Sequence, residues 1–108
     1  MRTPDELDQR SLALHQLVAD KVRQDAALLD RAKMIVQRWH QVASPRTFVY
    51  LDAWQGLLEK GEDACLAAAT EESDWGNALR QASPLACLLT NQERFAFLKQ
   101  WSQSHAPQ

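Results

Sequence analysis

Apolar residues recur along this chain every three to four positions, and no stretch alternates as a half-buried strand does. The clearest stripe consists of Leu28, Ala32, Ile35, Trp39 and Val42, with Leu29, Val36 and Ala43 beside it. The pattern predicts an all-α fold, a compact bundle of about five to six helices with a short penultimate one. We expect a single helical domain over residues 1–102 and a flexible tail at 103–108.

Three further segments carry the same helical period, and each predicts one face turned toward a core. They are a first helix with Leu7, Leu14, Val18 and Val22, a third with Phe48, Leu51, Trp54 and Leu58, and a last one with Phe95, Leu98 and Trp101.

Helix starts are marked by capping residues. Thr3 and Glu6 fit a capping box around Pro4, and Thr90 with Glu93 forms a second one. Asp25 is a plausible N-cap of the second helix, although residues 23–25 are compatible with either a break or a kink. Ser-Pro pairs at 44–45 and 83–84 indicate two more starts, and Gly61 after Lys60 predicts a helix end.

Residues 84–89 read PLACLL, an uncharged run in a chain of which 24% of the residues are charged. Since a Ser-Pro start precedes it and a capping box follows, we predict a short helix. Leu85, Leu88 and Leu89 are spaced to plug a core between the long helices and the last one. The alternative, an exposed apolar surface for a partner, stays open.

Composition limits the class of protein. A chain of 108 residues with 45% hydrophobic residues is typical of one globular domain. No apolar run has the length of about 20 residues that a membrane span needs, and residues 1–10 contain no signal-peptide core, so we expect a cytoplasmic protein. We interpret Cys65 and Cys87 as small apolar residues, Cys87 as an inert buried thiol.

The net charge of −2 conceals an uneven distribution. Residues 21–46 hold six bases against two acids, a local charge of +4, and residues 47–74 hold seven acids against one base, a local charge of −6. These segments are either solvated helix faces or surfaces that orient a partner or a second copy of the chain, and a homodimer is compatible with them.

The sequence contains no recognisable catalytic or metal-binding set. His15, His40 and His105 are far apart and have no metal-ligand spacing with either cysteine, and Gly56, Gly61 and Gly76 are isolated, so there is no glycine-rich phosphate loop. We therefore expect no cofactor, no metal and no enzymatic activity.

Protein binding is the function that the aromatic and acidic residues favour. Trp75 lies between Asp74 and Gly76 in the most acidic part of the chain, either as an exposed interface anchor or at the core edge. The residues we predict to contact a protein partner are Trp75, Glu71, Glu72, Asp74, Glu62, Asp63 and Trp101.

The alternative is a small DNA-binding regulator that uses the basic stretch 31–46. Its candidate contacts to phosphate are Arg31, Lys33, Arg38 and Arg46. The low isoelectric point of about 5.9 and the acidic middle of the chain disfavour this reading.

Residues 79–86 (LRQASPLA), 89–94 (LTNQER) and 11–15 (SLALH) together resemble small helical bacterial proteins from operons of the toxin–antitoxin kind. These motifs are mainly caps and core positions, so they bear on fold more than on function. The resemblance implies an antitoxin-like protein that neutralises a partner toxin by binding it, and it supplies no catalytic residue.

Overall fold

The computed structural model describes residues 4–105, and in this range the chain is all-α, as predicted, with no strand. No helix of this range is long and apolar enough to cross a membrane. The elements are α1 (Pro4–Gln24), α2 (Leu28–Val42), the 3₁₀ helix η1 (Pro45–Thr47), α3 (Phe48–Lys60), α4 (Glu62–Ala69), α5 (Asp74–Gln81), the 3₁₀ helix η2 (Leu85–Leu88) and α6 (Asn91–Ser104).

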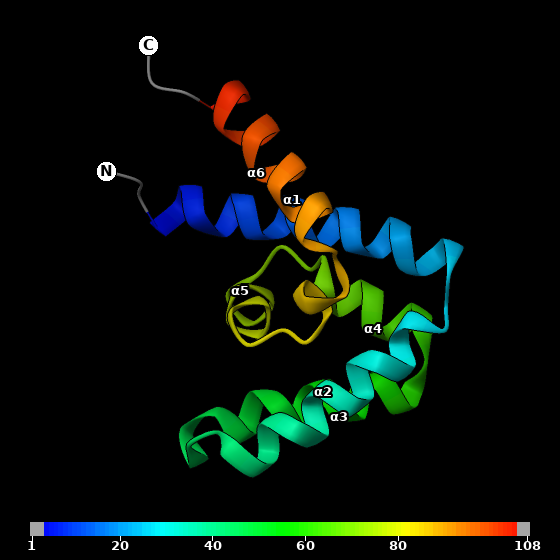
Figure 1. Cartoon of the computed structure of the whole chain (residues 1–108). Coiled ribbons are helices and arrows are strands. Elements are labelled where there is room, and N and C mark those ends of the chain that lie inside the picture. The colour runs from blue at the N-terminus through cyan, green and yellow to red at the C-terminus, as the bar shows by residue number, and fades with distance from the viewer. Residues whose placement is uncertain (1–3, 106–108) are drawn as a thin grey trace.

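The helices are arranged around the short elements in the middle of the molecule (Figure 1). α2 and α3 form an antiparallel hairpin, and α5 lies between this hairpin and α1. α4 packs against α1, α3 and α5, and η2 packs against α1 and α2. α6 extends away from the rest across α1, which makes it the most peripheral helix (Figure 1).

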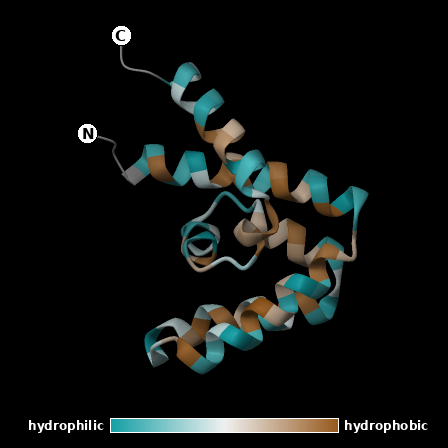
Figure 2. Cartoon of the chain, viewed as in Figure 1, coloured by the Kyte–Doolittle hydropathy of each residue, from teal (hydrophilic) through white to brown (hydrophobic). Residues whose placement is uncertain are grey.

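Trp54 lies at the centre of the core, as its stripe predicted. Its side chain is fully buried, and its indole Nε1 donates a hydrogen bond to the carbonyl oxygen of Leu79 at 2.9 Å, so its one polar atom is satisfied. Leu51 and Leu58 of α3 are buried beside it, and Val18 and Val22 of α1 contribute from above. Hydrophobic and hydrophilic bands alternate along the α2–α3 hairpin accordingly (Figure 2).

The run PLACLL is a buried plug. Leu85 and Leu88 are essentially inaccessible and Leu89 is 7% exposed, which confirms the prediction that they fill the core. The hydroxyl of Ser83 accepts the Leu85 N–H at 3.1 Å, but the cap position of η2 is Pro84 and makes no side-chain capping bond, so the helix starts one residue later than the Ser-Pro pair predicted. The prediction of a buried Cys87 is wrong, because a 3₁₀ helix has three residues per turn and aligns 85 with 88, which leaves Cys87 on the solvent side.

Two further predicted caps differ from the structure. α1 ends at Gln24 and α2 begins at Leu28, so residues 23–25 end one helix and do not kink a single long one. The cap position of α2 is Ala27 and not Asp25, and it makes no side-chain hydrogen bond. Ser44 makes no capping hydrogen bond either, because its proline starts the 3₁₀ helix η1 instead of α3. Gly61 follows α3 with φ 119°, as expected of glycine, and the predicted cap Thr3 lies outside the described residues.

Three predicted core positions are wrong. Leu7, near the start of α1, is 42% exposed. Val42 is 78% exposed, since the buried face of α2 is centred on Ala32 and Val36, and position 42 lies about 120° around the helix from 36. Phe95 is 71% exposed, and α6 has no fully buried residue. α2 and α6 each pack against the core on one side only, so their buried stripes are narrower than the sequence pattern indicated.

Candidate protein-binding site

Four carboxylates from distant parts of the chain converge on one groove. Asp5 and Asp8 lie in the first two turns of α1, Glu72 lies in the link between α4 and α5, and Asp74 is the first residue of α5. With Arg80 they line a depression of about 350 Å³, which we call the acidic groove. The sequence singled out Glu72 and Asp74 but missed Asp5 and Asp8. Asp5 is in the first turn of α1, where an acid is expected from the helix dipole alone, and Asp8 one turn later looks like an ordinary surface acid.

A tight turn holds the acidic link in place. The hydroxyl of Ser73 accepts the N–H of Gly76 at 3.0 Å and caps α5. A Cβ atom at Gly76 would lie 2.2 Å from the carbonyl oxygen of Glu71, so only glycine lets the link pass this close to the helix. Gly76 is therefore required by the turn, although from the sequence it only weakens α5.

The buried side chain of Arg80 joins the same link to α5 by hydrogen bonds. It is 5% exposed, and its Nη1 donates to the carbonyl oxygens of Ala69 at 3.1 Å and Glu71 at 2.8 Å, while Nη2 donates to Asn77 at 2.5 Å. Burial lowers the pKa of Arg80, which Asp8 among other acids counteracts. The sequence gave no reason to select it, since an arginine in the last turn of a helix is common on surfaces.

The other predicted acids do not all join this groove. Glu71 is exposed, but its carboxylate accepts a hydrogen bond from the Ser73 hydroxyl and its main chain binds Arg80, so it supports the turn. Glu62 and Asp63 are in the first turn of α4, and the length of that helix, about 12 Å, separates them from the acidic link.

Trp75 is half exposed, at 49%, and its ring lies 5.8 Å from the ring of Tyr50 on α3. α5 lies between α1 and α3 (Figure 1), so Trp75 is on the α3 side of α5 whereas the acidic groove is on the α1 side. The structure therefore places the aromatic residue and the carboxylates on opposite flanks of one short helix.

Trp101 belongs to a third location, on α6. It is partly buried and stacks on His105 with ring centroids 3.6 Å apart and on Phe97 at 6.1 Å. These contacts are within α6, so Trp101 is remote in sequence and in the fold from the other predicted partner residues.

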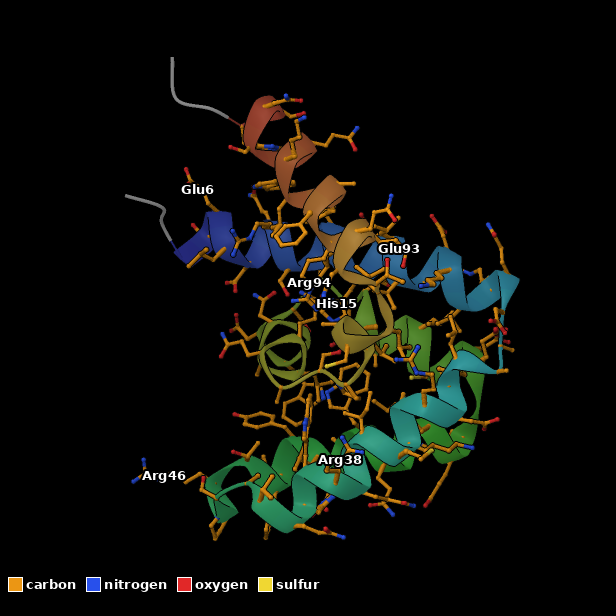
Figure 3. The ribbon with its side chains drawn as sticks, viewed as in Figure 1. Glu6, His15, Arg38, Arg46, Glu93 and Arg94 are labelled. Atoms are coloured by element: carbon orange, nitrogen blue, oxygen red, sulfur yellow. The ribbon has the colours of Figure 1, made fainter. Side chains whose placement is uncertain are left out.

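The four basic candidates are divided among different surfaces. Arg31 and Arg38 are two turns apart on one face of α2, whereas Lys33 lines a small depression against α3 with Glu59. Arg46 is on η1, beyond the end of α2, and its side chain points away from the molecule at a distance from Arg38 (Figure 3). The folded chain therefore presents no continuous basic surface made of these four residues.

His40 and the two cysteines are the other titratable groups with chemistry that a site could use. His40 donates through Nδ1 to the Val36 carbonyl at 3.0 Å and through Nε2 to Asp52 at 2.8 Å, and the Asp52 carboxylate raises the pKa of His40. Both cysteines are free, and burial raises the pKa of Cys65 to about 11, which keeps its thiol protonated. Among residues 4–105 no group of three His, Cys, Asp or Glu side chains is placed to hold a metal ion.

Comparison with family models, with curated proteins and with solved structures finds no match to this chain. The functional argument therefore depends on the geometry described above.

Proposed function

We propose that this protein is a non-enzymatic binding module that receives a basic segment of a protein partner in the acidic groove. The observation that carries the proposal is the convergence of Asp5, Asp8, Glu72 and Asp74 on one depression. Arg80 is the one base in its lining, and both of its Nη atoms already donate to oxygens of the protein. The groove thus has an excess of negative charge that a lysine or arginine of a partner can neutralise.

The carboxylates supply orientation and association rate more than affinity. An exposed ion pair contributes about 0 to 1 kcal/mol, so apolar contact must add to it. Trp75 and Tyr50 offer such contact across α5, and a helix with its side chains is only about 10 Å wide. A partner surface of the usual size, about 800 Å², covers both flanks of α5 at once.

The concrete form of the proposal is an antitoxin-like protein that covers a basic active site or substrate groove of a toxin. Two arguments support this form: the resemblance of the chain to helical proteins of toxin–antitoxin operons, and the negative charge of the acidic groove. In this form Trp75 acts as an apolar anchor on the other flank of α5 from the groove.

The proposal is tested by co-expressing the tagged protein with the product of each neighbouring gene and measuring which of them it retains. A triple variant, Asp8→Asn, Glu72→Gln and Asp74→Asn, neutralises three lining carboxylates. We expect it to lose a retained partner, or to bind it at least tenfold more weakly, and to relieve any growth inhibition less well than the wild type.

The matched control is a second triple variant, Asp25→Asn, Asp30→Asn and Glu59→Gln, which removes the same charge from exposed positions outside the groove. It should bind like the wild type. Equal losses in the two variants would indicate a general charge effect and overturn the proposal, as would the retention of no neighbouring product. Light scattering of the purified complex gives its stoichiometry and reveals any homodimer.

A further inference from the structure

A second cavity, on the other side of Arg80, has the opposite charge. It has a volume of about 270 Å³ and lies between the first half of α1, η2 and the first half of α6. Its charged or titratable lining residues are Arg10, His15, Arg80 and Arg94, and no carboxylate lines it. We call it the arginine cavity; Figure 3 shows His15 and Arg94 together between α1, α5 and α6.

His15 is a buried group with an unsatisfied atom. It is 1% exposed, and its Nδ1 donates to the carbonyl oxygen of Ser11 at 2.7 Å, which leaves Nε2 as the second polar atom of the ring. Nε2 has no hydrogen-bond partner among the described residues. Buried polar atoms are almost always paired, so an orphan in the wall of a cavity points to a missing partner inside it.

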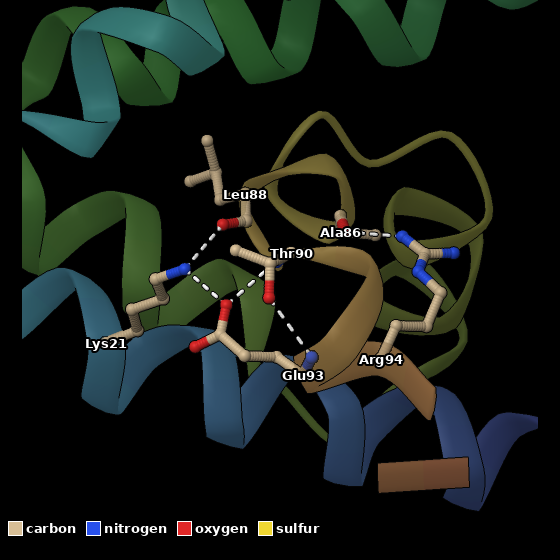
Figure 4. Close-up of polar contacts among 6 residues, drawn as sticks. All are labelled: Lys21, Ala86, Leu88, Thr90, Glu93 and Arg94. Carbon is tan, nitrogen blue, oxygen red and sulfur yellow. Dashed lines mark hydrogen bonds and ion pairs between the residues drawn. The ribbon is translucent and has the colours of Figure 1, made fainter. Parts of the chain in front are cut away.

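The arginines also have unused donors. Arg80, 5% exposed, has a buried Nε without a partner among residues 4–105. Arg94 donates one bond, from Nη2 to the Ala86 carbonyl at 2.7 Å (Figure 4), and the remaining four N–H groups of its guanidinium make no bond within the described range. Arg10 makes no hydrogen bond or ion pair with any residue of that range.

Charge and shape together specify the class of ligand. Three guanidinium groups around one small cavity repel each other unless a negative charge lies between them, and the acids that act on Arg80 are Asp8, Glu71 and Glu72, which do not line this cavity. Phe97 and Leu98 lie on the same face of α6 as Arg94 and add apolar surface to the lining. The volume is near the lower end of that of small-molecule sites, about 300 Å³, and too small for a folded partner.

We propose that the arginine cavity binds a small organic anion whose carboxylate or phosphate group is held by Arg10 and Arg94 and whose apolar body contacts Phe97 and Leu98. A hydroxyl of the ligand, or a water molecule bound with it, donates to Nε2 of His15. The guanidinium fork of arginine matches the oxygens of both anionic groups. The arginine cavity and the acidic groove share only Arg80 in their linings. A test of anion binding is therefore independent of whether a protein partner binds the groove.

The test is a titration of the full chain, followed by the imidazole NMR signals of His15, with three probes: inorganic phosphate, phenyl phosphate and phenylacetate. We expect phenyl phosphate, phenylacetate or both to shift the His15 signals saturably, at concentrations up to about 10 mM and more weakly in high salt. A preference between the two identifies the anionic group, and weaker binding of inorganic phosphate supports the contact with Phe97 and Leu98.

The first variant is Arg10→Gln, because Arg10 makes no hydrogen bond or ion pair with residues 4–105, and the second is Arg94→Gln. Each should weaken binding at least tenfold, whereas the control Arg38→Gln, on the exposed face of α2, should not change it. Circular dichroism verifies that each variant is folded. Absence of a saturable shift with all three probes, or equal binding by Arg10→Gln and wild type, would falsify the proposal.

Discussion

At the scale of single residues, the most informative group is His15, which is neutral inside the folded protein. Burial lowers the pKa of His15 to about 4, against a hydrogen bond to Ser11 that raises it, and the charge of Arg80 lowers it further. In the unfolded chain an ordinary histidine has a pKa of about 6.5. Between these two values the unfolded chain binds a proton that the folded protein does not.

His15 therefore makes the protein sensitive to acid. Its contribution to stability is fully present above about pH 6.5 and is lost as the pH falls toward 4. From pH 7 to pH 4.5 we expect a loss of about 2 kcal/mol of unfolding free energy that is absent in His15→Phe, as measured by urea denaturation. The control is His105→Phe, an exposed histidine, which should follow the pH dependence of the wild type. A His15→Phe profile parallel to the wild type would contradict the assignment.

Two glycines on helices have opposite structural roles, which a pair of substitutions distinguishes. Gly76→Ala forces its Cβ against the Glu71 carbonyl, so we expect a loss of about 3 kcal/mol. Gly56→Ala on α3 meets no atom within 4 Å and should stabilise the protein by about 1 kcal/mol through helix propensity. Urea denaturation measures both changes, and a Gly76→Ala protein as stable as the wild type would show that the link between α4 and α5 moves freely.

At the scale of elements, the two helix starts predicted at Thr90 and at Ser44 differ in the structure. The Thr90 hydroxyl accepts the N–H of Glu93 at 3.1 Å, and the Glu93 carboxylate accepts the N–H of Thr90 at 2.8 Å, which completes the predicted capping box (Figure 4). Ser44 makes no such bond. Thr90→Ala should therefore cost about 1 kcal/mol, whereas Ser44→Ala should change the stability by less than about 0.5 kcal/mol. Urea denaturation of both variants measures the two changes in unfolding free energy, and equal changes would mean that the hydrogen bonds of the Thr90 cap add no stability.

The same elements show what the sequence could and could not predict. Helix period and capping chemistry are local, so the all-α class, the PLACLL plug and the capping box of α6 were predicted correctly. The exposure of Val42 and Phe95 depends on which neighbours cover a helix, and a single stripe does not contain that information. The acidic groove and the arginine cavity were missed for a related reason, because α1 contributes to both from positions far away in the chain.

At the scale of the molecule, the basic segment 21–46 and the acidic segment 47–74 lie against each other. The basic segment contains α2 and the acidic one contains α3, and these helices pack antiparallel so that His40 binds Asp52 and Lys33 lines one depression with Glu59. Between these two helices the contact of His40 with Asp52 uses one of the seven acids of residues 47–74. The acidic groove is instead built from α1, the α4–α5 link and α5, and it is the surface that our proposal assigns to a basic partner.

The distribution of burial over the molecule also predicts where it opens first. α1 and α3 contain fully buried side chains, whereas α6 contains none. Lys21 of α1 contacts the start of α6, because its Nζ lies 2.5 Å from Oε1 of Glu93 and 3.0 Å from the Leu88 carbonyl oxygen (Figure 4). Lys21 and the capping bond lower the pKa of Glu93 to about 2. A helix with few buried contacts opens at a lower free energy than the core.

We therefore expect amide hydrogen exchange to be faster throughout α6 than in α1 and α3, at a pH where the Lys21–Glu93 pair is charged. Glu93→Gln weakens this pair and the cap together, so it should raise exchange in α6 further and leave α3 unchanged. Lys99→Gln, an exposed change on α6 outside the pair, is the control and should exchange like the wild type. Exchange at one uniform rate in α1, α3 and α6 would mean that α6 unfolds only with the core. Arg94, Phe97 and Leu98 would then line the arginine cavity from a helix as stable as α1.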